Sequence, residues 1–312
     1  MSRLEKTSVP EKGVTDNSLS QIKNIPSVKD LKTSLINLRE QHGYAPDGIW
    51  SDDRLDTAAQ GIEIYTRVYN QASEQLKKYL NDLNIIQGFI GVRPVVGLGR
   101  EAPETMFVKS HFPRPRMRDL LFLQVHEELQ RLLETHTEGK IRLEKIDYRN
   151  VKYVNTYRFE LMNVAAIQNI ANENLDLFPK NVSPTEWLIQ NPAAWPMAPQ
   201  AASEDARIKE VRSGVLSGFP RSASDKYSAE STSGIDWKKT LVKLIKEPQG
   251  KDLISRKVEH TPLRTAEEKE VIARSGLGYV HYSEADLNWT KDAAALLKHL
   301  TELLELPVLK SN

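Results

Sequence analysis

Hydrophobic residues recur at helical spacing over much of this chain. Val28, Leu31, Leu35 and Leu38 lie three or four positions apart, a spacing that predicts one buried stripe on an amphipathic helix over residues 28–42. Similar periodicity predicts further helices at 52–83, 117–135, 156–174, 203–216, 237–246, 264–275 and 288–304. The chain is therefore expected to be dominated by helices.

Only a few segments have the pattern of β-strands. Residues 85–101 are rich in β-branched side chains and punctuated by glycine, which predicts one or two short strands. Apolar and polar residues alternate over 140–147, and residues 279–282 are a further candidate strand. We therefore expect an α+β, helix-dominated fold, with a small N-terminal helical module and a mixed α/β body that has few short strands.

Proline, glycine and serine indicate where the chain divides. Residues 179–203 hold five prolines and two tryptophans and are expected to form a linker or a packed loop, while the Gly/Ser-rich residues 217–235 are expected to interrupt the helices. The predicted organisation is a disordered tail at 1–25, a helical module at 26–84, an α+β region at 85–178, the proline-rich segment at 179–203 and a mainly helical C-terminal domain at 204–312.

Charge and cysteine content exclude several classes of function. The 43 basic and 42 acidic residues give a net charge of +1, so we expect no nucleic-acid partner and no attraction to an anionic membrane. The absence of cysteine excludes disulfides and thiolate metal sites, and the seven histidines lack metal-binding spacing. We expect no cofactor.

The start of the chain and its overall hydropathy bear on its compartment. The first 21 residues lack the apolar segment of a secretory signal, and no apolar run approaches the ~20 residues that would span a bilayer. We expect a soluble protein that is either cytoplasmic or exported by a route without a cleavable signal peptide.

A turn follows the first predicted helix. Gly43 and Tyr44 precede the sequence Asp47-Gly48-Ile49-Trp50, and Ser51 is suited to cap the next helix. Residues 28–83 thus resemble the small three-helix peptidoglycan-binding module. The resemblance implies that cell-wall glycan, or a partner protein, is bound through Tyr44, Asp47 and Trp50. The same residues are also typical of a structural helix-turn-helix hairpin closed by an aromatic side chain.

Basic residues gather ahead of the helix predicted at 117–135. Residues 109–118 contain four cations and two prolines, and alternation would place Arg114, Arg116 and Arg118 on one side. Guanidinium groups bind phosphate or carboxylate through paired hydrogen bonds, which suggests an anionic ligand or partner. Solvated arginines paired with nearby acidic residues are the alternative.

A histidine and an acid lie close together before the last predicted helix. His281 could act as a general base oriented by Glu284 or Asp286, and His260 could join it in space. A structural histidine on a strand and an acid near a helix N-terminus explain the same residues.

Two functional hypotheses follow. The first is a non-catalytic binding or assembly protein, whose N-terminal module recognises cell-wall glycan or a partner protein. The alternative is an intracellular hydrolase or transferase that acts on an anionic substrate, with a C-terminal site of His281, Asp286 and His260. Convergence of these three residues on one cleft would favour the enzyme.

Overall fold

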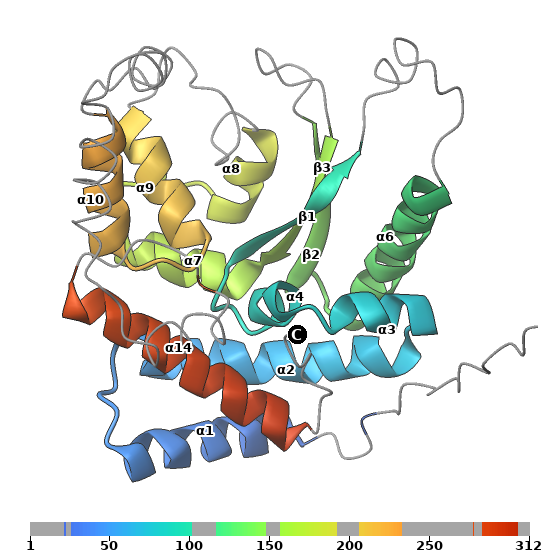
Figure 1. The fold of residues 1–312 in the computed structure, drawn as a ribbon, viewed down its shortest axis with the longest axis horizontal. Helices are drawn as coiled ribbons and strands as arrows, with labels where there is room; N and C mark the ends of the chain where they lie inside the picture. The colour runs from blue at the N-terminus through green and yellow to red at the C-terminus, as the bar shows by residue number, and fades with distance from the viewer. Residues whose placement is uncertain are drawn as a thin grey trace, which may run out of the picture.

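The computed structural model describes residues 22, 26–101, 117–147, 157–191, 206–232, 277 and 283–304 (Figure 1). In these residues helices surround one three-stranded antiparallel sheet. The predicted helix-dominated α+β class is therefore confirmed.

The sheet is formed by β1 (Val95–Glu101), β2 (Ile141–Asp147) and β3 (Tyr157–Asn163), in the order β1-β3-β2. The alternating pattern of residues 140–147 correctly predicted β2. The prediction of one helix over 156–174 was wrong in its first half, which is the central strand β3. Helix α7 (Val164–Glu173) begins only after Asn163, whose side chain accepts a hydrogen bond from the Ala166 N–H.

The N-terminal residues form α1 (Val28–His42), a short 3-10 helix η1 (Gly48–Trp50) and α2 (Asp52–Gln71). Ser27 caps α1, and Gly43 ends it in the left-handed conformation with φ 66°, as glycine at this position predicts.

The single helix predicted over 52–83 is three helices: α2, α3 (Glu74–Leu80) and α4 (Leu83–Phe89). The chain leaves the helix at Ala72, and Ser73 starts α3 by accepting a hydrogen bond from the Leu76 N–H. The Ser73 hydroxyl also donates to Glu128 of helix α6 (Met117–His136) at 2.7 Å. A contact between segments far apart in sequence thus accompanies this break, and periodicity did not reveal it. Residues 85–89, the first part of the segment expected to form strands, belong to α4.

The later helices are α8 (Pro184–Gln190), α9 (Ala206–Leu216), α10 (Arg221–Thr232) and α14 (Glu284–Leu303). Helix α10 replaces much of the break expected at 217–235. It is stabilised by an ion pair one turn apart, Arg221 to Asp225 at 2.7 Å, and packs tightly on α9, because a Cβ at Gly214 would lie 2.2 Å from Ser224 Oγ. The elements expected at 237–246, 264–275 and 279–282 lie outside the described residues.

One hydrophobic core joins the two ends of the chain. Leu31 and Leu35 of α1 lie in the same buried cluster as Trp50 and as Leu297 and Leu300 of α14. Figure 1 shows α14 crossing beside α1 and α2. Residues 26–84 therefore share their core with residues 284–304, which the predicted boundaries separate.

A second cluster lies on the other face of the sheet, against α7, α8 and α9. Leu188 of α8 is buried in it. Part of the segment expected at 179–203 is therefore a packed helix rather than a free linker. None of the helices in the described ranges is both long enough and apolar enough to cross a membrane.

Candidate functional site

The turn after α1 is built on two stacked aromatic rings. The ring centroids of Tyr44 and Trp50 lie 4.5 Å apart, with an angle of 4° between the ring planes. Arg39 Nη1 donates hydrogen bonds to the Trp50 carbonyl at 3.0 Å and to Asp52 at 2.6 Å, which ties the end of α1 to the start of α2.

The three binding residues predicted in this turn differ in how far they are exposed to solvent. Trp50 is only 1% exposed, so its indole belongs to the core and does not contribute a contact surface. Tyr44 is half-buried and Asp47 is exposed, and both remain candidates for contact with a ligand.

Helix α14 packs against the turn, an arrangement that sequence did not predict. A Cβ at Gly48 would lie 3.4 Å from the Trp289 ring, and Trp289 Nε1 donates to the Gly218 carbonyl at 3.0 Å. Asp292 lies on the same helix. Burial and nearby Asp47 raise the pKa of Asp292, while the Trp50 indole N–H opposes this rise. That N–H itself has no partner at hydrogen-bond distance in the described structure, so its effect on Asp292 is that of a longer contact.

A groove of about 350 Å³ runs between α1 and α14. Most of its lining side chains are polar: Asp30, Thr33, Ser34, Asn37, Leu38, Gln41 and His299. The first six belong to α1. Leu38 is part of the apolar stripe that made the helix predictable, and the other five are the polar side chains beside it. The sequence contained this polar side but could not show that His299, 265 positions after Ser34, borders it.

Ser34 and His299 meet in the groove, with Ser34 Oγ and His299 Nε2 3.2 Å apart. Burial lowers the pKa of His299, nearby Glu302 opposes that shift, and His42 adds to it. Because the ordinary pKa is 6.5, the imidazole is mainly neutral at pH 7. The groove thus presents hydroxyl, amide and imidazole groups, with one carboxylate at Asp30.

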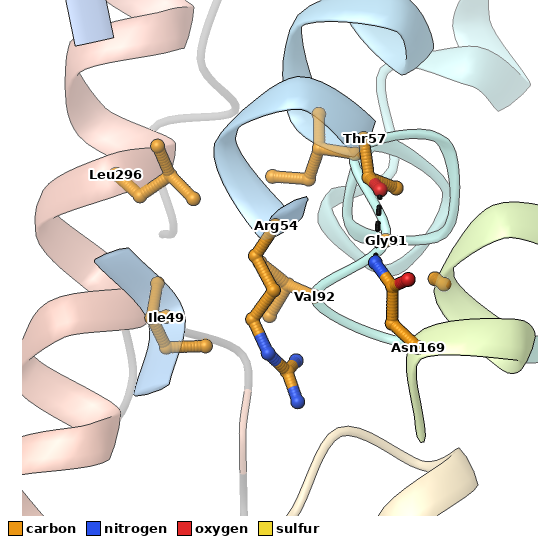
Figure 2. Close-up of a pocket in the computed structure, with 9 residues that line it drawn as sticks. Ile49, Arg54, Thr57, Gly91, Val92, Asn169 and Leu296 are labelled. Atoms are coloured by element: carbon orange, nitrogen blue, oxygen red, sulfur yellow. Dashed lines mark hydrogen bonds between the residues drawn. The ribbon is translucent and has the colours of Figure 1, made fainter. Parts of the chain in front are cut away.

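A small cavity lies on another side of α14 (Figure 2). It has a volume of about 10 Å³, room for about one water molecule. Its lining comes from η1, α2, the link after α4, α7 and α14: Ile49, Arg54, Thr57, Ile90, Gly91, Val92, Ala166, Asn169 and Leu296.

Of the proposed catalytic residues, only Asp286 is described. Its side chain is fully buried and accepts a hydrogen bond from Ser222 Oγ at 2.6 Å. Its backbone N–H donates to Ser283, the N-cap of α14. Asp286 thus joins α10 to the first turn of α14, as expected of an acid at a helix start.

Most of the other predicted site residues lie outside the part of the chain that the structure describes. His260, His281, Arg114 and Arg116 are not among the described residues, and Arg118 is described only as part of the first turn of α6. The convergence that would favour an enzyme is therefore still a prediction. In the described part of the chain, no three His, Cys, Asp or Glu side chains are grouped so as to hold a metal ion.

Comparison with known proteins yields no relative. No family model, curated protein or solved structure shows detectable similarity to this chain.

Proposed function

We propose that this chain is a non-catalytic binding protein that recognises cell-wall glycan in the groove between α1 and α14. The observation that carries the proposal is the groove itself, whose lining is mostly polar and mostly uncharged. It is formed by a helix of the segment that resembles a peptidoglycan-binding module.

The chemistry of the groove suits a glycan. Sugar rings offer hydroxyl and amide groups that both donate and accept hydrogen bonds. Ser34 and Thr33 hydroxyls and the Asn37 and Gln41 amides can also do both. Polar groups arranged along a preformed groove fix the orientation of a ligand and provide specificity.

Two aromatic rings follow Gln41, the last residue of α1 that lines the groove. The His42 and Tyr44 rings stack with centroids 5.5 Å apart, and His42 is close enough to His299 to affect its charge. Tyr44 is supported from beneath by Trp50. A half-buried ring with a hydroxyl at one end can contact both the apolar face and the polar edge of a sugar.

The experiment is sedimentation of the full chain with insoluble peptidoglycan. The test variant is Asn37→Ala/Gln41→Ala, which removes two exposed amides one turn apart on α1. The matched control is Gln168→Ala/Asn172→Ala, which removes two exposed amides at the same spacing on α7.

We expect the wild-type chain to sediment and the α1 variant to bind at least about tenfold more weakly, since each lost hydrogen bond contributes about 1 kcal/mol. The α7 variant should bind like wild type. Absence of wild-type binding, or equal losses in the two variants, would contradict the proposal.

A further inference from the structure

The His299 ring is a titratable group that a ligand in the groove would cover. It lines the groove from α14, and its Nε2 lies 3.2 Å from Ser34 Oγ of α1. The ring is half-buried, so solvent still reaches part of it. A glycan lying in the groove would remove water from that part.

Protonation changes the hydrogen bonds that the ring offers. In a neutral imidazole one nitrogen donates a hydrogen bond and the other accepts one, whereas in the cation both nitrogens donate. Protonation therefore turns an acceptor into a donor. Because Ser34 Oγ is in direct contact with Nε2, the direction in which the hydroxyl points depends on the state of the ring. A ligand matched to the neutral groove would lose contacts when His299 becomes charged.

Charges on both helices act on the ring. On α14, Glu302 favours protonation of His299, and Lys298 Nζ lies 3.8 Å from the same carboxylate and reduces its effect. On α1, His42 opposes protonation. Asp30 also lines the groove, but its carboxylate already accepts a hydrogen bond from Ser27 Oγ at 2.7 Å.

Charged side chains at the neighbouring elements have other partners in the described structure. Asp56 of α2 pairs with Lys32 at 3.1 Å, and Asp52 pairs with Arg39 at 2.6 Å. Asp47, ahead of η1, acts on Asp292 instead. The protonated ring is therefore supported mainly by Glu302 among the described residues, and a ligand would add further desolvation.

These conditions couple proton binding to ligand binding. Burial already lowers the pKa of His299 below the ordinary 6.5, and a ligand that covers the ring lowers this pKa further, because the charged form loses more hydration. Above both pKa values, affinity does not depend on His299. As pH falls through the pKa of the free chain, the free chain takes up a proton that the complex resists, so affinity decreases.

We propose that protonation of His299 releases glycan from the groove, so that the chain binds its ligand at neutral pH and loses it in acid. The inference rests on the proposed function, because it concerns the same groove and the same class of ligand. It adds a control of binding by pH and assigns that control to the ring that α14 contributes.

The test is sedimentation of the full chain with insoluble peptidoglycan at a series of pH values from about 8 to about 4.5. The test variant is His299→Gln, since glutamine can keep a hydrogen bond to Ser34 but does not titrate. The matched control is His136→Gln, at a half-buried histidine in the last turn of α6. Ionisable groups of the peptidoglycan affect all three chains alike, so the differences between chains isolate His299.

We expect the affinity of the wild-type chain to fall about tenfold across the series, which corresponds to a ligand that lowers the pKa of His299 by about one unit. His136→Gln should show the same fall. His299→Gln should lose most of it while binding well at the alkaline end.

Nuclear magnetic resonance of the wild-type chain gives an answer even if His299→Gln fails to fold. Titration of the His299 ring, with and without soluble glycan fragments released from peptidoglycan, should show a lower pKa in the complex. An equal or higher pKa in the complex, or equal pH dependence in wild type and His299→Gln, would overturn the inference. Binding at the alkaline end would in that case leave the proposed function intact. Absence of sedimentation at every pH would contradict the proposed function, and this inference with it.

Discussion

Tyr44 lies flat on Trp50, with ring centroids 4.5 Å apart and an angle of 4° between the ring planes. Trp50 is buried and Tyr44 is half-buried, so one ring of the pair belongs to the core and the other borders the solvent. The shape of the surface at this turn therefore depends on a residue that a ligand does not reach. Substitutions in the pair should separate stability from binding.

Trp50→Ala should lower the free energy of unfolding by about 3–5 kcal/mol, because it leaves a large cavity in the core. Tyr44→Ala should lower it by only about 1 kcal/mol, the value of an aromatic pair with one ring at the surface. Urea denaturation of both variants measures the difference. A Trp50→Ala chain within about 1 kcal/mol of wild type would show that the indole does not support the turn. Tyr44→Ala is accordingly the better variant for binding experiments.

Asp286→Ala should destabilise the chain by about 1–3 kcal/mol, since Ser222 Oγ loses the acceptor that it contacts at 2.6 Å. Glu284→Ala, at an exposed position in the same helical turn, is the control and should change stability by less than about 1 kcal/mol. Thermal unfolding of the two variants tests this. An Asp286→Ala chain with unchanged stability would refute the structural role and return attention to the catalytic hypothesis.

His299 should make stability depend on pH. Burial depresses its folded-state pKa below the ordinary 6.5. As pH falls below 6.5, the unfolded chain takes up a proton that folded His299 resists, so the free energy of unfolding decreases until the folded pKa is reached. His299→Gln removes this contribution.

The measurement is chemical denaturation of wild type and His299→Gln between about pH 8 and about pH 5. We expect the difference between the two chains to be constant at the alkaline end and to move in favour of the variant at the acidic end. His42 and Glu302 also act on His299, so His42→Gln should weaken the pH dependence. Parallel curves for wild type and His299→Gln would contradict the account.

Asp292 should make stability depend on pH in the opposite direction to His299. Burial and Asp47 raise its folded-state pKa above the ordinary 3.8, so its contribution to stability is present below pH 3.8 and is lost as pH rises through the folded pKa. Asp292→Asn should therefore stabilise the chain at pH 7 and lose that advantage in acid. Asp53→Asn, at an exposed acid in the first turn of α2, should not stabilise it. Thermal unfolding at pH 7 decides the matter, and a lower melting temperature for Asp292→Asn would count against the burial of this carboxylate.

Sequence periodicity predicted the elements whose pattern is local. The stripe through Leu31 and Leu35 predicted α1, and the alternation over 140–147 predicted β2. Local periodicity did not predict the structure where contacts between distant segments determine it. Ser73, at the break between α2 and α3, donates a hydrogen bond to Glu128. Strand β3 pairs with another strand on each of its edges.

The site was predictable only in part for the same reason. Glycine and aromatic residues indicated the turn at Tyr44 and Trp50, but aromatic character alone does not separate a core ring from a contact ring. Ser34 and His299 are 265 positions apart, and no local pattern indicates that α14 completes a groove on α1. Arg54 was similarly hidden, because its neighbours Glu173 and Trp289 come from two other helices.

The central claim is that glycan lies between α1 and α14, and hydrogen exchange of the full chain tests it most directly. The amides to follow are those of Val28–His42 and of residues 292–303, with and without soluble glycan fragments released from peptidoglycan. Binding should slow exchange in both segments, because a bound ligand stabilises the elements that it bridges against local opening. Protection confined to other segments, such as residues 206–232, or no protection at saturating glycan, would contradict the claim.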